Sequence, residues 1–208
     1  MRNPWEKISL ADYENHMKLE SVKQLQSLNR TVKSQLFDYE VNTVMILGVA
    51  GGNGLEHIDT KKYNKVYGID INQSYLQAVE HRYQNLAGVL QCINVDLTEE
   101  HVTLPNAQLL IANLLIEYIG YNAFQKVVQV TKPTYVSCVI QINTDDENWV
   151  SDSPYIHSFD CLDSIHNQMN EHVLTEMMDC IGYKKIFICR DYLPNGKSLV
   201  RLDYQLHS

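Results

Sequence analysis

Residues 48–54 read Gly-Val-Ala-Gly-Gly-Asn-Gly and follow the apolar run that begins at Val44. Glycine has no Cβ, so a bend of this composition lets another molecule approach the backbone closely, and its N–H groups suit an anion. A nucleotide phosphate is the first ligand to consider for such a bend. The candidate binding residues within it are Gly48, Ala50, Gly51, Gly52 and Asn53.

Polar residues also stand where three later hydrophobic runs end. Asp70 closes "VYGID", Asp96 closes "INVD" and Asn113 closes "LLIAN". Ligands of open α/β sheets bind at the carboxyl ends of the strands, so these side chains and the bend should meet at one edge. A carboxylate such as Asp70 can accept both hydroxyls of a ribose, and Asp96 suits the exocyclic amine of adenine. Strands often end in Asp or Asn only to begin a turn, but together with the bend these residues predict an adenosine site.

The glycine spacing disfavours a dinucleotide. The dinucleotide fingerprint is G-x-G-x-x-G, and no frame of the bend provides it. After Gly52 and Gly54 the third glycine would have to stand at position 57, which is His57. A nicotinamide-dependent oxidoreductase is therefore a weak reading of this bend.

Hydrophobic patterning predicts the elements that hold these residues. Near-continuous apolar runs alternating with amphipathic segments indicate a mostly parallel sheet with helices on both faces, an α/β fold. We expect a helix directly after the bend, a helical stretch over residues 1–40 and a polar, loop-like stretch over residues 144–171. The other expected elements are strands at 43–50, 65–70, 89–96, 107–113 and 134–143, and helices at 74–86, 121–133 and 171–183.

The end of the chain departs from this alternation. Two strand patterns, 184–193 and 197–206, are separated only by "PNG". So short a connection cannot make a parallel crossover, and Asn195-Gly196 is a strong hairpin signal. The last two strands should therefore be antiparallel, forming a C-terminal β-hairpin.

With the bend, the two acids and the hairpin in place, the chain from about Thr43 to its C-terminus resembles a class I S-adenosylmethionine-dependent methyltransferase. The resemblance implies a seven-stranded sheet whose last strand lies beside the fifth, with S-adenosyl-L-methionine as the cofactor. It implies one methyltransferase domain, residues 41–208, and an N-terminal helical segment, residues 1–40, that closes over the cofactor site. The residues it implies for cofactor binding beyond the bend are Tyr13, His16, Asp70, Ile71, Asp96, Leu97 and Asn113.

The bend differs from the usual pattern of that family at two positions. Gly48 stands where the family has an acid, and Ala50 stands at the first glycine. The acid ordinarily helps to hold the cofactor's ammonium, so another group must do so here. Ala50 is sterically mild if its φ is negative. The cofactor's carboxylate suits the N–H groups of the bend and of the helix expected after it.

Two residues are candidates for the chemistry itself. Glu117, just past the fourth strand, occupies the position that faces the acceptor in this family. It could act as a general base or balance the sulfonium charge, or it could simply begin a helix. His157 is the candidate base on the polar stretch, where Trp149, Tyr155 and Phe159 could line an acceptor pocket. No metal is expected, because the histidine spacing and the absence of C-x-x-C suggest none.

The charge composition of the chain indicates which classes of binding partner to expect. The net charge of −8 and the absence of a basic stripe disfavour nucleic acid and favour a small-molecule acceptor. No apolar run is long enough to span a bilayer and no signal-peptide pattern opens the chain, so a cytoplasmic protein is expected. The oligomeric state is left open. Two other functions also remain open: an aminopropyltransferase of the spermidine-synthase kind, and a non-catalytic nucleoside-binding module.

Overall fold

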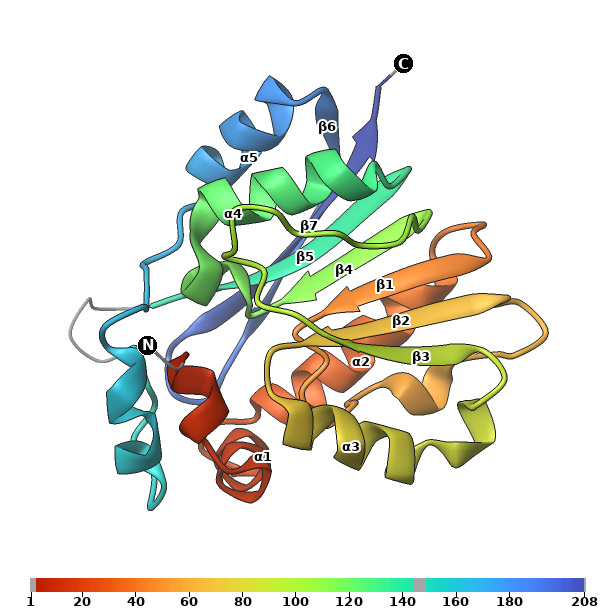
Figure 1. Cartoon of the computed structure of the whole chain (residues 1–208). Coiled ribbons are helices and arrows are strands. Elements are labelled where there is room, and N and C mark those ends of the chain that lie inside the picture. The colour runs from red at the N-terminus through yellow and green to blue at the C-terminus, as the bar shows by residue number, and fades with distance from the viewer. Residues whose placement is uncertain (1–2, 144–148, 208) are drawn as a thin grey trace.

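The computed structural model describes residues 3–143 and 149–207, and a single seven-stranded sheet forms its centre (Figure 1). The strand order is β3-β2-β1-β4-β5-β7-β6. Strands β1 to β5 pair in parallel, and β7 runs antiparallel to both β5 and β6. The expected fold class and the C-terminal hairpin are thereby confirmed. The strands are β1 (Thr43–Leu47), β2 (Lys65–Asp70), β3 (Leu90–Asn94), β4 (Leu109–Asn113), β5 (Tyr135–Ile142), β6 (Tyr183–Tyr192) and β7 (Ser198–Leu206).

Helices cover both faces of this sheet (Figure 1). Met45 and Leu47 pack in the core cluster that includes the α4 and α5 side chains, whereas Val44 and Ile46 pack in the cluster of α2 and α3. Both sides of β1 are buried, which is why its sequence is a continuous apolar run. The α-helices are α1 (Leu10–Lys18), α2 (Gln24–Phe37), α3 (Gln73–Arg82), α4 (Ile116–Thr131) and α5 (Glu171–Cys180), and the 3-10 helices are η1 (Pro4–Lys7), η2 (Leu55–His57), η3 (Gln84–Leu86) and η4 (Ile156–Leu162).

The N-terminal segment is not one helical stretch. It folds as η1, α1 and α2, and the turn between α1 and α2 places Lys23 at a φ of 56°. Val22 lies in that turn with none of its surface exposed. An apolar residue buried in a turn looks the same in the sequence as one buried in a helix, and no glycine or proline marks the break.

The helix expected after the glycine bend is also absent from the structure. Only the three-residue η2 follows the bend, and α2, which precedes β1 in the chain, covers this part of the sheet. Gly54 has a φ of +95°, and a Cβ there would lie 2.6 Å from Cγ1 of Val32 on α2. The last glycine of the bend therefore serves the packing of α2 against it.

We expect the substitution Gly54→Ala to lower the free energy of unfolding by about 2–4 kcal/mol, since it combines left-handed backbone strain with a collision against Val32. Gly88→Ala is the matched control, because a Cβ at Gly88 meets nothing within 4 Å. Urea denaturation of the two variants measures the difference. Equal stability of the two variants would mean that α2 does not hold Gly54 in this way.

Of the polar stretch expected to be loop-like, residues 144–148 lie outside the described residues. The remainder holds η4 and leads into α5. Among the helices of the described part of the chain, none is long and apolar enough to cross a membrane.

Candidate cofactor and acceptor site

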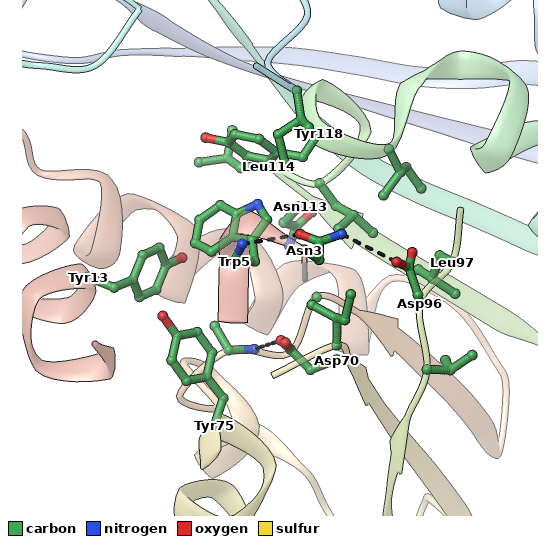
Figure 2. A pocket seen from close by; sticks show the side chains of 17 residues that line it. Asn3, Trp5, Tyr13, Asp70, Tyr75, Asp96, Leu97, Asn113, Leu114 and Tyr118 are labelled. Atoms are coloured by element: carbon green, nitrogen blue, oxygen red, sulfur yellow. Dashed lines mark hydrogen bonds between the residues drawn. The ribbon is translucent and has the colours of Figure 1, made fainter. Parts of the chain in front are cut away.

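A pocket of about 680 Å³, its open mouth included, lies where the carboxyl ends of β1, β2 and β4 meet the N-terminal segment (Figure 2). Asn3, Trp5 and Tyr13 line it from the N-terminal side. Of these three residues only Tyr13 was predicted from the sequence. The further sequence-predicted residues that the structure brings to this pocket are Gly48, Ala50, Asp70, Ile71, Asp96, Leu97 and Asn113.

Asp70 joins the second strand to the glycine bend. Its Oδ2 accepts the N–H of Ala50 at 2.8 Å, and its Oδ1 accepts the N–H of Asn72 at 2.9 Å. Burial raises the pKa of this carboxyl, and the two N–H donors oppose the rise. Because a carboxylate has about four lone-pair sites, both oxygens can still accept a hydrogen bond from a ligand.

Asp96 meets the N-terminal segment across the pocket. Its Oδ2 is 3.4 Å from Nδ2 of Asn3 (Figure 2). Its Oδ1 accepts the N–H of Thr98 at 2.8 Å. The same segment is tied to the α3 side, because Tyr75 Oη donates to the carbonyl of Ile8 at 3.0 Å. The side-chain amide of Asn3 therefore lies beside Asp96, where the sequence predicts the adenine amine of a ligand. Asn3, Trp5 and Tyr75 were missed from the sequence, since no motif marks them.

The glycine bend departs from its expected backbone at Ala50. The φ of Ala50 is +46°, in the left-handed region, and not negative as an unstrained alanine would require. The backbone is therefore strained at this position. At Gly52 a Cβ would lie 2.6 Å from the ring of Tyr83, so this glycine makes room for the end of α3, and it is not among the residues that line the pocket of Asp70 and Asp96. A smaller pocket behind the bend is lined by Glu14 together with Gly51 and Asn53.

An ion pair lies over the bend. Arg82 Nη1 donates to the carbonyl of Gly51 at 3.0 Å, and Arg82 Nη2 donates to Glu14 Oε2 at 2.9 Å. Both charges are partly exposed. A cation and an anion therefore stand together beside the backbone that lacks the usual acid at Gly48.

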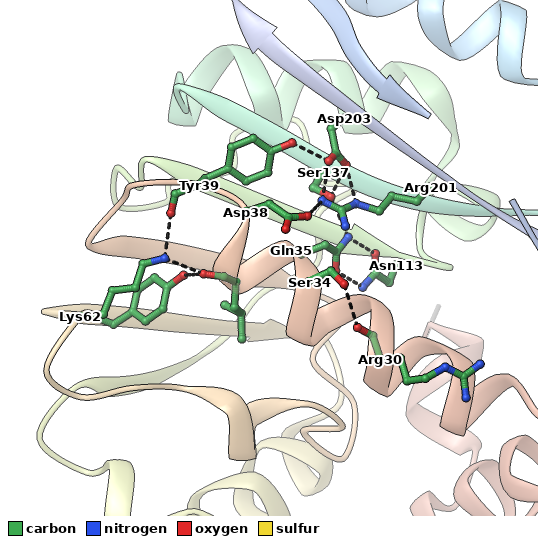
Figure 3. A network of polar contacts seen from close by, with 12 residues as sticks. Arg30, Ser34, Gln35, Asp38, Tyr39, Lys62, Asn113, Ser137, Arg201 and Asp203 are labelled. Carbon is green, nitrogen blue, oxygen red and sulfur yellow. Dashed lines mark hydrogen bonds and ion pairs between the residues drawn. The ribbon is translucent and has the colours of Figure 1, made fainter. Parts of the chain in front are cut away.

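A buried polar network supports the pocket from behind (Figure 3). The side chains of Asn113 and Gln35 exchange hydrogen bonds of 2.9 and 3.0 Å. Gln35 also donates to Ser137 at 2.8 Å, and Ser137 donates to Asp203, which pairs with Arg201 at 2.6 Å. The amide of Asn113 is thus engaged with α2, so Asn113 links the pocket to the core.

A second pocket, of about 560 Å³ with its mouth included, adjoins the first. Trp5, Tyr13, Leu114 and Tyr118 line both. The second pocket also contains Glu117, whose residue surface is 3% exposed. The N–H of Gln141 donates to Glu117 Oε1 at 2.8 Å, but Oε2 has no hydrogen-bond partner among the described residues. Burial raises the pKa of Glu117 to about 7.

The histidines divide between this pocket and the surface. His16 lines the second pocket and lies 2.8 Å from Ser153 Oγ. His166, which sequence reasoning did not single out as a base, lines it too and stacks on Trp149. Burial, followed by the charge of Lys197, lowers the pKa of each imidazole to about 4.

The structure does not place His157 with the other candidates. Its side chain is 89% exposed and lies 3.3 Å from Asp160, because the η4 turn directs it outward. The expectation that His157 faces the acceptor pocket is therefore not met. Phe159, on the same turn, does line the pocket. Within the described residues, no group of three or more side chains is arranged to hold a metal ion.

Comparison with known proteins finds similarity in structure but not in sequence. No protein-family model and no curated protein sequence matches the chain. Solved structures do match. The methyltransferase domain of bacterial Hen1 (CtHen1-C) has a TM-score of 0.67 at 18% identity, covering 88% of this chain and 98% of that one.

Two structures with a bound product of the cofactor are similar to a comparable degree. Magnesium protoporphyrin IX methyltransferase (ChlM) from Synechocystis PCC 6803, with bound S-adenosylhomocysteine, has a TM-score of 0.67 at 12% identity, covering 89% of this chain and 84% of that one. The N-methyltransferase NodS from Bradyrhizobium japonicum WM9, in complex with S-adenosylhomocysteine, has a TM-score of 0.65 at 10% identity, covering 96% and 98%. Identities this low show the fold alone. The chain has the fold of class I S-adenosylmethionine-dependent methyltransferases.

Proposed function

We propose that this protein transfers a methyl group from S-adenosylmethionine to a small-molecule acceptor. The observation that supports this most directly is the shared pocket. Asp70 at the end of β2 and Asp96 just after β3 face it, and the glycine bend borders it at Gly48 and Ala50. The residues fit the cofactor: Asp70 offers two acceptors for the ribose, Asp96 one for the adenine amine, and Ile71 and Leu97 apolar walls for the base.

The N-terminal segment then closes the site. In this proposal residues 1–40 cover the bound cofactor, with Tyr13 contacting it and His16 facing the neighbouring acceptor pocket. Trp5 and Tyr13 line both pockets, so they keep water from the space between cofactor and acceptor. The Asn3 amide must leave Asp96 when an adenine amine arrives there.

Bound S-adenosylmethionine supplies an electrophilic methyl group on a sulfonium sulfur. The chain itself contributes placement, because holding a nucleophile in line with a reactive group is worth on the order of 7–11 kcal/mol. Leu114 and Tyr118 stand where the two pockets adjoin and so fix the acceptor beside the cofactor. Glu117, with a pKa near 7, can hold a proton from the acceptor.

Glu14 and Arg82 take the place of the missing acid in this proposal. Glu14 would bind the ammonium of the cofactor and Arg82 its carboxylate, each exchanging part of their mutual ion pair for the ligand. We expect Glu14→Gln to weaken the binding of S-adenosylhomocysteine by about three- to tenfold, because the substitution removes one charged hydrogen bond at a partly exposed site. Calorimetry measures the change.

The control for Glu14→Gln is 5′-methylthioadenosine, a nucleoside thioether without the amino-acid end. Its affinity should be the same in both proteins, because Glu14 does not line the pocket of Asp70 and Asp96. An equal loss for both ligands would assign Glu14 to the general shape of the site and not to the ammonium.

Calorimetric titration of the unmodified protein tests the function itself. We expect S-adenosylmethionine and S-adenosylhomocysteine to bind, and the decarboxylated cofactor to bind less tightly than either. A preference for the decarboxylated cofactor would favour the aminopropyltransferase. Binding without formation of S-adenosylhomocysteine across a broad panel of small-molecule acceptors would favour the non-catalytic module, and no binding of any of the three would refute the proposal.

A further inference from the structure

Aromatic side chains form a large part of the wall of the second pocket. Five rings from separate segments line it, together with the imidazoles of His16 and His166. The rings contact one another edge to face, as Trp5 and Tyr118 do at 4.9 Å between centroids and Trp5 and Tyr13 at 5.9 Å. The five are Trp5, Tyr13, Tyr118, Trp149 and Phe159.

Glu117 is the carboxylate in this aromatic enclosure, and its Oε2 lacks a partner among the described residues. The polar side chains around it are occupied with one another. Gln141 Nε2 donates to Asn143 at 2.6 Å and to the Trp149 carbonyl at 2.9 Å, and Gln24 donates to Gln141. A buried acceptor left without a donor costs about 1–3 kcal/mol, so a ligand that donates there gains by satisfying it.

The charges around the pocket favour a cation. The described residues that line it include no lysine or arginine. Both imidazoles have a pKa near 4, so they are neutral at pH 7. Lys197 lies close enough to influence them, but its ammonium donates to the Trp149 carbonyl at 2.5 Å and is not part of the lining. An anionic ligand would meet Glu117 in a water-poor space, whereas a cation gains both the carboxylate and the ring faces.

We propose that the second pocket binds an organic ammonium group, so that the acceptor of the proposed methyl transfer is an amine. Glu117 holds the ammonium through Oε2, and the aromatic rings surround it. This inference rests on the proposed function for its chemistry but not for its binding test.

A primary amine would enter this pocket as its ammonium ion. The ammonium gives one proton to the Glu117 carboxylate, which leaves a neutral amine with a free lone pair. That pair forms the new N–C bond as the C–S bond to the methyl group breaks and its electrons remain on sulfur. The product is a methylated ammonium, and the proton on Glu117 passes to solvent.

The test compares a cation with its neutral isostere, in calorimetric titrations of the protein with and without S-adenosylhomocysteine. The probes are choline and 3,3-dimethylbutan-1-ol, which have nearly the same shape and differ in charge. The quaternary nitrogen of choline has no N–H, so this pair tests the attraction of a cation and not the hydrogen bond to Oε2. We expect choline to bind at least about tenfold more tightly, as cation–π and ion-pair contacts predict. Equal or tighter binding of the alcohol in both titrations would overturn the proposal.

Matched variants locate the effect. Glu117→Gln keeps an oxygen for the Gln141 N–H but removes the negative charge, so it should reduce choline affinity about tenfold while leaving that of the alcohol unchanged. Tyr118→Phe keeps the ring and should retain choline binding, whereas Tyr118→Leu should lose about three- to tenfold. Unchanged choline affinity in both Glu117→Gln and Tyr118→Leu would place the cation elsewhere.

The two proposals fail separately. Binding of S-adenosylhomocysteine without choline preference would leave the methyltransferase proposal intact and refute the amine. Choline preference that depends on Glu117, without binding of any adenosyl ligand, would keep the ammonium site and refute the methyl donor.

Discussion

Asp70→Asn is expected to weaken the binding of both S-adenosylhomocysteine and 5′-methylthioadenosine by at least about tenfold. The carboxylate of Asp70 has two tasks in this structure: its oxygens accept the N–H groups of Ala50 and Asn72, and they border the pocket. Asparagine keeps one acceptor and turns the other into a donor, so a ribose loses a charged partner and the bend loses a brace. Calorimetry with the two ligands measures the loss.

Asp59→Asn is the matched control for Asp70→Asn. Asp59 also accepts a backbone N–H, that of Lys61 at 2.9 Å, but it does not line the pocket of Asp70 and Asp96. Its substitution should leave both affinities unchanged. If Asp70→Asn remains folded by circular dichroism and binds both ligands as well as the unsubstituted protein, Asp70 does not hold a ribose.

Arg201→Met is expected to lower the free energy of unfolding by about 3–5 kcal/mol, because it leaves a buried carboxylate without its cation. Asp203 has no exposed surface, and Arg201 donates to it from Nε at 3.0 Å and from Nη2 at 2.6 Å (Figure 3). Tyr39 and Ser137 also donate to Asp203 but carry no charge. Urea denaturation measures the change.

Two comparisons sharpen the Arg201 prediction. The double variant Arg201→Met, Asp203→Leu should regain a large part of the stability, since replacing both members of a buried pair by apolar groups is often tolerated. Lys184→Met breaks the exposed pair with Asp179 and should cost no more than about 1 kcal/mol. A single Arg201→Met variant as stable as Lys184→Met would show that Asp203 does not depend on Arg201 in the fold.

The network around Arg201 connects core stability to the site. Asn113 borders the pocket, and its amide is bound by Gln35, which also donates to Ser137. A change at Arg201 should therefore reach the end of β4 through three hydrogen-bonded side chains. The cofactor affinity of Arg201→Met, measured at a temperature where the variant is folded, reports this coupling.

The fold class was within reach of the sequence because it depends on local patterns. The buried run of β1 and the alternation of strands and helices predicted a parallel sheet, and Asn195-Gly196 predicted the hairpin. The ends of strands are also local features, so the sequence alone was enough to predict that Asp70, Asp96 and Asn113 lie at one edge of the sheet. A reversed last strand beside the fifth came from the family resemblance and is confirmed.

The tertiary structure decided what packs against those ends. Sequence periodicity did not reveal that α2 would take the place of a helix after the bend, because Val32 and Gly54 meet only in the folded chain. Periodicity also could not predict which way side chains point on irregular segments. The η4 turn exposes His157 to solvent, whereas His166 lines the second pocket. Local sequence patterns determine which residues end each strand. Contacts between distant segments determine which of these residues share a cavity, and those contacts form only when the chain folds.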